Sequence, residues 1–130
     1  MIEWKVEFET GIPSADYEHR KLVELVNELH EQAATAACPA TAAASLAKIV
    51  SHFTAHFRVE EEVMRAADFA GFDEHRHDHE HLLAEIGEAL YRLERGESMA
   101  PDLVERLELW LVRHFHTWDK PMYRFLDRVP

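Results

Sequence analysis

Apolar residues recur every three or four positions in four separate stretches of the chain, which is the spacing of one face of an α-helix. The stretches are separated by short segments containing proline, glycine and alanine, and none shows the strict alternation of a β-strand. Four amphipathic helices with short connections predict an all-α fold, an up-down-up-down antiparallel four-helix bundle. The predicted elements are an N-terminal arm over 1–15, helices over 16–36, 41–67, 73–95 and 101–118, and a short C-terminal helix or tail over 119–130.

Helix-ending and helix-starting residues set these boundaries. Asp16 is a suitable N-cap for the first helix, because its side chain can accept a hydrogen bond from the first turn. Pro39 interrupts an alanine-rich tract and predicts a helix end, a short loop and a new helix. Pro101 suits the first turn of the fourth helix. Pro121 lacks a backbone donor, so we expect it to kink or stop that helix just past Asp119.

Each predicted apolar face also contains histidine or acidic residues among its leucines, valines and aromatic residues. A buried imidazole or carboxylate is unfavourable unless it is paired or bound to a metal ion. Repetition in four helices makes a shared metal centre the favoured interpretation. The candidate ligands are His19, His56, Glu60, His75, His79, His114 and Asp119.

Three of the helices supply a pair of candidates. The spacing suits a site on one helix face for His56 with Glu60 and for His75 with His79. Residues four apart lie about 40° apart around a helix and about 6 Å along it, so both can reach one centre. His114 and Asp119 are five apart, which is about 140° of rotation. Asp119 must therefore reach in from the helix end or from a locally altered turn.

The third helix offers a competing pair, His77 and His81, with the same spacing as His75 and His79. The competing pair points about 200° away, and only the 75/79 face continues into Leu82. Glu61 and Glu62 are expected to lie next to the ligands without binding the metal, or at the surface. The histidines expected at solvated or rim positions are His30, His52, His77, His81 and His116.

Composition narrows the class of protein. A chain of 130 residues with 47% hydrophobic and 30% charged residues fits one water-soluble domain over 1–130, and no apolar run approaches the roughly 18 residues of a membrane span. The N-terminus lacks the features of a secretory signal, so a cytoplasmic location is expected. A formal charge of −11 argues against nucleic acid and anionic membranes as partners. Cys38 is the only cysteine and forms no internal disulfide; we assign it no role.

The types of ligand indicate which metal such a centre could hold. Imidazole with carboxylate suits iron, zinc, copper or nickel, and the lack of thiolates disfavours structural zinc and iron–sulfur clusters. Seven ligands are too many for one ordinary ion. Two octahedral ions that share both carboxylates and a bridging oxide or hydroxide would fill about eleven of twelve positions, leaving one for a small ligand such as O2.

An ordered set of motifs runs through nearly the whole chain. It consists of Trp4, Gly11-Ile12, Asp16-Tyr17-Glu18-His19, the segment from His56 to Met64, His75 and His79 followed by Leu82-Leu83, and Trp110-Leu111-Val112-Arg113-His114 with Asp119. This set resembles the hemerythrin family, in particular the single-domain bacterial hemerythrins.

The resemblance implies a non-haem di-iron centre that binds O2 reversibly, end-on at an iron held by two histidines. The implied assignment is His75, His79 and His114 on one iron, His19 and His56 on the other, and Glu60 and Asp119 as bridges. Reversible binding requires an apolar lining that keeps out water. By their proximity to the ligands we expect this lining to include Leu22, Phe57, Trp110 and Leu111.

The sequence therefore predicts an oxygen carrier, storage or delivery protein rather than an enzyme. We expect a monomer, with an oxygen-consuming enzyme as a possible recipient. One alternative is an oxygen or redox sensor, in which the arm around Trp4 shifts and alters the contact with a separate partner. Another is a di-iron enzyme that consumes peroxide or oxygen. Such carboxylate-rich enzymes use Glu-x-x-His motifs, which Asp16-x-x-His19 and Asp78-x-x-His81 resemble only superficially.

Overall fold

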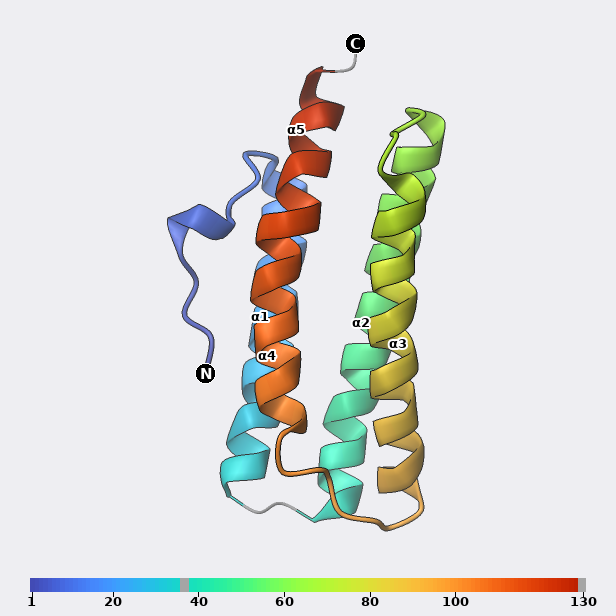
Figure 1. The fold of residues 1–130 in the computed structure, drawn as a ribbon. Helices are drawn as coiled ribbons and strands as arrows, with labels where there is room; N and C mark the ends of the chain where they lie inside the picture. Colours follow the sequence, from blue (N-terminus) through green and yellow to red (C-terminus); the bar gives the residue numbers. More distant parts are fainter. Residues whose placement is uncertain (36–37, 129–130) are drawn as a thin grey trace.

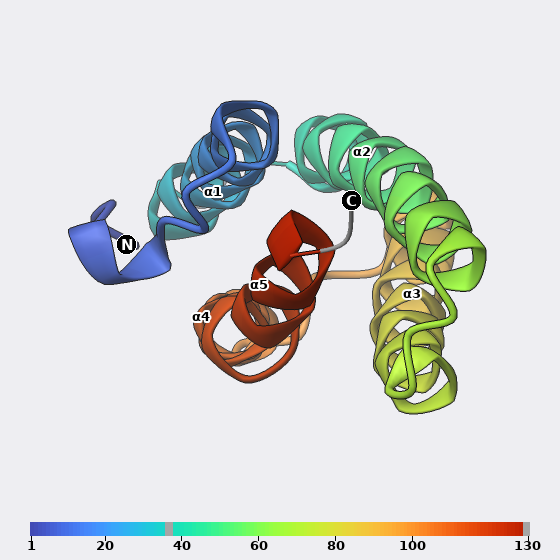
Figure 2. The same ribbon diagram turned by 90° about the horizontal axis from the view of Figure 1, so that it is seen from above.

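The computed structural model describes residues 1–35 and 38–128, and these form an antiparallel four-helix bundle (Figures 1 and 2). The predicted all-α class is confirmed, since the described residues contain no strand. The predicted first-helix end at residue 36 and the last two residues of the predicted tail lie outside the described residues. The helices are α1 (Pro13–Ala34), α2 (Pro39–Ala66), α3 (Phe72–Glu94), α4 (Leu103–His114) and α5 (Lys120–Arg128), with a 3-10 turn at Val6–Phe8 and a π-helical segment at Phe115–Asp119.

The first helix begins three residues earlier than predicted, and Asp16 is not its N-cap. Ile12 occupies the cap position and Pro13 the first helical position, where its fixed φ is already helical and its missing N–H has no helical role. The carboxylate of Asp16 instead accepts hydrogen bonds from the backbone N–H (2.7 Å) and the hydroxyl (2.9 Å) of Thr10. Asp16 therefore fastens the arm to α1.

The fourth helix begins at Leu103, two residues later than predicted. The Leu103 N–H donates to the carbonyl of Ala100 at 3.1 Å, so Pro101 is the second residue of a turn. Proline is favoured at that position because its φ matches the turn. Pro101 thus belongs to the connection that leads into α4.

Pro121 was expected to kink or stop the fourth helix just past Asp119; the α-helical part ends earlier, at His114, and a short C-terminal helix, α5, follows from Lys120. After α4 the helix continues with the wider turn of the π-helical segment. The N–H of Lys120, directly after this segment, donates to the carbonyl of Phe115, five residues back. The chain then continues as α5, with Pro121 at its second residue.

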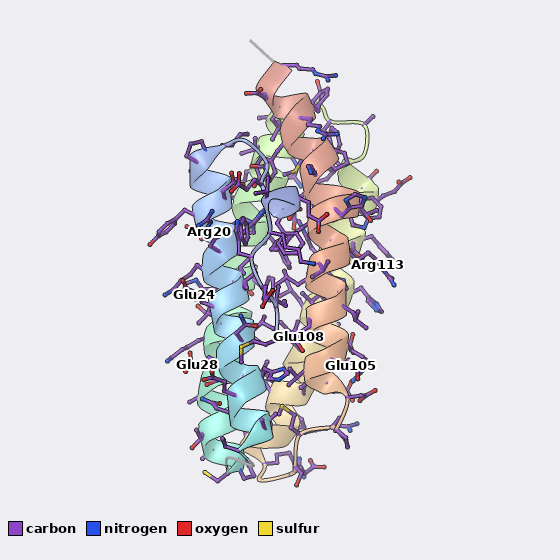
Figure 3. All side chains as sticks on the ribbon, turned by 90° about the vertical axis from the view of Figure 1, so that its left-hand side faces the viewer. Arg20, Glu24, Glu28, Glu105, Glu108 and Arg113 are labelled. Atoms are coloured by element: carbon purple, nitrogen blue, oxygen red, sulfur yellow. The ribbon has the colours of Figure 1, made fainter. Side chains whose placement is uncertain are left out.

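Much of the apolar core lies in the half of the bundle near the α1–α2 and α3–α4 connections, drawn at the bottom of Figure 1. Val26, Leu29, Leu46 and Ile49 are fully buried there. The N-terminal arm covers the face between α1 and α4 (Figure 3). There the rings of Trp4 and Phe8 pack against each other and against Phe115. Among the described helices, none has the length and apolar character needed to cross a membrane.

Candidate metal centre

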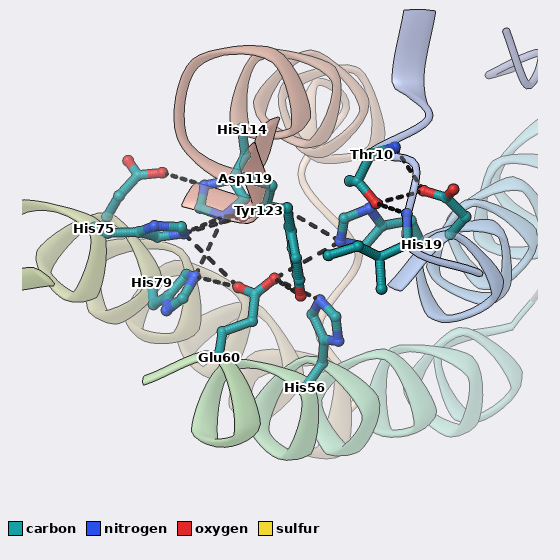
Figure 4. A network of polar contacts seen from close by, with 12 residues as sticks. Thr10, His19, His56, Glu60, His75, His79, His114, Asp119 and Tyr123 are labelled. Carbon is teal, nitrogen blue, oxygen red and sulfur yellow. Dashed lines mark hydrogen bonds and ion pairs between the residues drawn. The ribbon is translucent and has the colours of Figure 1, made fainter. Parts of the chain in front are cut away.

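All seven predicted ligands lie in the half of the bundle nearest the α2–α3 connection. Antiparallel helices produce this arrangement, because the early part of α1 and α3 lies level with the late part of α2 and α4. His56 is 8% exposed and the other six residues are at most 1% exposed. In Figure 4 the imidazoles of His75, His79 and His114 lie on one side of Glu60, and those of His19 and His56 lie on the other.

The seven side chains form two groups that share their carboxylates. In each group, one potential ligand atom from every residue lies within 4.8 Å of those from the others. Sharing both carboxylates places the two groups side by side, so each could hold a cation. The first group is Glu60, His75, His79, His114 and Asp119, and the second is His19, His56, Glu60 and Asp119.

The π-helical segment brings Asp119 to the cluster. A π turn closes over five residues, so residues five apart, which diverge on an α-helix, face the same side. His114 Nε2 consequently lies 2.8 Å from Asp119 Oδ1, and both side chains are buried. The sequence spacing required an altered turn or a helix end, and the structure supplies the altered turn.

Several buried nitrogen and oxygen atoms of the cluster converge on one another. Nε2 of His79 and Nε2 of His114 are 3.2 Å apart, yet the Nδ1 atoms of both rings point at outer carboxylates. When both rings are neutral with their protons on Nδ1, the two Nε2 lone pairs face each other, which a bound proton or cation relieves. His19 Nε2, His56 Nε2 and Glu60 Oε1 are buried without an aligned hydrogen-bond partner. Such convergent donor atoms fit a bound cation, which they could all coordinate.

The pKa values show that the cluster attracts positive charge. Burial alone would lower the pKa of His114, but Asp119 and Asp78 outweigh it and raise that pKa to about 10. Asp119 and Glu60 likewise overcome burial and raise the pKa of His19 to about 9. The histidines in turn hold the pKa of Glu60 and of Asp119 well below the usual range, although burial and the repulsion between the two carboxylates oppose this. Protons therefore occupy the metal-free cluster, and a metal ion would have to displace them.

Three aromatic rings stack on the candidate ligands. Phe57 lies 3.7 Å from His79 between ring centroids, and Trp110 lies 4.4 Å from His114. Phe115, which the sequence analysis did not single out, stacks on His19 at 4.4 Å. These rings hold the imidazoles in place and exclude water from one side of each.

The other residues nominated for an O2 pocket lie in the apolar core. Leu22 and Leu111 are 2% and 1% exposed and belong to the main core cluster, as Phe57 does, with Trp110 packed against it. A separate groove of about 520 Å³ between α1, α2 and α5 reaches His56 and Glu60. None of the four nominated residues lines this groove. Their role in binding O2 stays a prediction.

Tyr123 is a site residue that sequence reasoning missed. Its hydroxyl donates a hydrogen bond of 2.9 Å to Glu60 Oε2. Burial and the nearby charges of Glu60 and Asp119 raise the pKa of Tyr123 far above its usual value, so the phenol stays protonated and remains a donor. A sequence signal existed, since Tyr123 follows Asp119 by four residues and shares its helix face.

Two outer carboxylates contact candidate ligands. Glu61 Oε2 lies 2.9 Å from His79 Nδ1, which agrees with the expectation that Glu61 stands outside the ligands. Asp78 Oδ2 lies 2.7 Å from His114 Nδ1. The sequence analysis gave Asp78 no role at the site, because its position relative to α4 depends on packing between helices.

The remaining histidines lie outside the two groups. His77, His81 and His116 are exposed, and the competing 77/81 pair thus points to solvent. His52 is half-buried and lines the groove near His56. His30, also half-buried, lies 3.2 Å from Glu108 at the other end of the molecule.

The fold and the cluster together define a helical-bundle protein with a buried histidine–carboxylate cluster that could hold cations. Residues 10–126 match the Hemerythrin HHE cation binding domain, and the chain belongs to the hemerythrin family. It is 28% identical over 120 residues to the bacteriohemerythrin of Stenotrophomonas maltophilia (strain R551-3), covering 92% of this chain and 78% of the relative. It is 29% identical over 122 residues to that of Methylococcus capsulatus (strain ATCC 33009 / NCIMB 11132 / Bath), covering 92% of both.

Solved structures give the same result. The fold matches a crystal structure of wild-type hemerythrin with a TM-score of 0.89 and 27% sequence identity. The match covers 97% of this chain and 98% of that one. The predicted family is therefore confirmed by sequence and by fold.

Proposed function

We propose that this protein binds O2 reversibly at a non-haem di-iron centre, for oxygen carriage, storage or delivery. The observation that carries the proposal is the pair of overlapping groups that share Glu60 and Asp119. Two irons would be held by His75, His79 and His114 at one position and by His19 and His56 at the other. When bound, the two irons would supply the electrons and the coordination position with which O2 binds.

The side chains around the centre suit binding without consumption of the ligand. Phe57, Trp110 and Phe115 cover the imidazoles, which would limit the access of water. The Tyr123 hydroxyl would hold Glu60 in its bridging orientation through their hydrogen bond. The position with two histidines has fewer protein ligands, so it is the one where we place O2. This chemistry is that of an oxygen-binding protein and not of an enzyme.

The biological setting completes the proposal. We infer a monomeric protein in the cytoplasm, where the exposed Cys38 would stay reduced. An oxygen-consuming enzyme would be the recipient of the bound O2. The apolar groove that reaches His56 and Glu60 offers a small neutral molecule an approach to the two-histidine position.

A sensor role is the second candidate, and one contact path favours it. Trp4 and Phe8 of the arm pack against Phe115 with ring centroids 6.2 and 5.9 Å away, and Phe115 stacks on His19. A change at the two-histidine position could thus reach the arm through one aromatic ring. Fluorescence of Trp4 that differs between the reduced and oxygenated protein, and a partner that binds only one of these forms, would favour the sensor.

Iron content and colour test the main proposal directly. The reduced protein is prepared without oxygen, exposed to O2, and returned to inert gas while the visible spectrum is recorded. We expect two irons per chain and an absorption band that appears with O2 and disappears on its removal. Fewer than two irons, or a band that forms once and does not reverse, would overturn reversible binding at a di-iron centre.

A further inference from the structure

The two candidate metal positions differ in the partners of their histidines. At the three-histidine position, His79 and His114 each direct Nδ1 at a carboxylate, Glu61 at 2.9 Å and Asp78 at 2.7 Å. Nδ1 of His19, at the other position, has no hydrogen-bond partner among the described residues, and neither has Nδ1 of His75, the third histidine of the three-histidine position. The outer carboxylates come from α2 and α3, and each side chain is 26% exposed. They are therefore largely shielded from solvent and lie against the buried rings of His79 and His114.

A carboxylate behind an imidazole changes what the ring offers to a metal. The Nδ1–H donates to the carboxylate, which fixes the tautomer and leaves the lone pair on Nε2 toward the centre. The negative charge also makes the ring a stronger electron donor. Because stronger donors and nearby negative charge favour a more highly charged ion, ferric iron gains more than ferrous iron from such partners.

We propose that Glu61 and Asp78 are positioning residues that make the two metal positions unequal. They strengthen binding at the three-histidine position and lower the reduction potential of an iron held there. This inference rests on the proposed two-metal site.

Charge-removing variants of the same shape test the proposal. Glu61→Gln and Asp78→Asn keep an oxygen acceptor for the imidazole N–H but lose the negative charge. Glu62→Gln on α2 and Glu80→Gln on α3 are matched controls, because both residues are exposed and outside the cluster. Cobalt(II), which needs no O2 chemistry, is titrated into each metal-free protein against a competing chelator. The metal-free proteins are also unfolded with denaturant to measure their stability.

We expect the wild-type protein to bind two cobalt ions, and each test variant to bind one of them about 10–100-fold more weakly, with the controls unchanged. In the iron-loaded protein the potential of one iron should rise in the test variants, by about 59 mV for each tenfold loss of preference for ferric over ferrous. A purely structural role would instead lower the stability of the metal-free protein and leave both measurements unchanged.

The outcomes separate this inference from the proposed function. If the wild-type protein binds fewer than two ions, the two-metal site itself is wrong. If it binds two, and Glu61→Gln and Asp78→Asn behave as the controls do, only the role of the outer carboxylates is overturned. An equal loss of affinity for both cobalt ions would also overturn it, since the proposal requires the loss to be confined to the three-histidine position.

Discussion

The two halves of the bundle share the same four helices and bury different kinds of side chain. Near the α1–α2 and α3–α4 connections the interior is apolar, with Val26, Leu29, Leu46 and Ile49 fully buried. Near the α2–α3 connection the interior contains seven histidines and carboxylates whose donor atoms converge. The apolar half is stabilised by removal of its surface from water, which does not depend on a ligand. The polar half becomes favourable only when protons or metal ions balance its charges.

Removal of a shared carboxylate should produce the largest difference between the halves. In Glu60→Ala both groups lose a ligand and the histidines lose their counter-charge, so we expect both metal ions to be lost. Removing one partner from a buried charged cluster also costs about 3–5 kcal/mol. Leu46→Ala is the control in the apolar half, with a cost of about 3 kcal/mol and no loss of metal. Metal content and denaturant unfolding check both variants, and two ions per chain in Glu60→Ala would contradict the shared role.

Removal of the metal should loosen only one half. The metal-loaded protein is stabilised by about 4 kcal/mol when free metal is a thousandfold above its dissociation constant, and chelation removes that term. We expect amide hydrogen exchange to accelerate around residues 56–60, 75–79 and 114–119, while residues 26–29 and 46–49 stay protected. Uniform acceleration along the chain would show that the two halves unfold as one unit.

Changes in pH should affect the metal-free protein on both sides of a narrow range. His19 and His114, with pKa values raised from 6.5 to about 9 and about 10, contribute stability below pH 6.5 that is lost as the pH rises through those values. Glu60 and Asp119 have lowered pKa values, so their contribution is present above about pH 4.5 and is lost in acid. Unfolding at several pH values should place maximal stability between about pH 4.5 and 6.5. Stability that keeps rising above pH 7 would contradict this balance.

The smallest effect is expected at the competing histidine pair. His77 and His81 are exposed and outside the two groups, so replacing both by alanine should change stability by less than about 0.5 kcal/mol and leave metal content intact. His75→Ala on the same helix provides the contrast, because it removes a buried candidate ligand. Loss of metal from the 77/81 variant would show that the wrong face of α3 was chosen.

Helical periodicity alone was enough to predict the four helices and the buried face of each. That face contained His56 with Glu60 and His75 with His79, because residues four apart on a helix share a side whatever packs against it. Boundaries were less reliable. Pro13, placed in the arm by the predicted boundaries, begins the first helix, and Pro101, expected in the first turn of the fourth helix, lies in the turn that precedes it.

The sequence by itself therefore determined the fold class and the shared helix faces of His56 with Glu60 and of His75 with His79, since both depend on spacing along single helices. Tertiary structure decided how those residues meet. The π-helical turn that brings Asp119 beside His114, the stacking of Phe115 on His19, and the contacts of Asp78 and Tyr123 all join different helices or require an altered backbone. Periodicity cannot specify such contacts, because they depend on the distance and rotation between packed helices rather than on position along one of them.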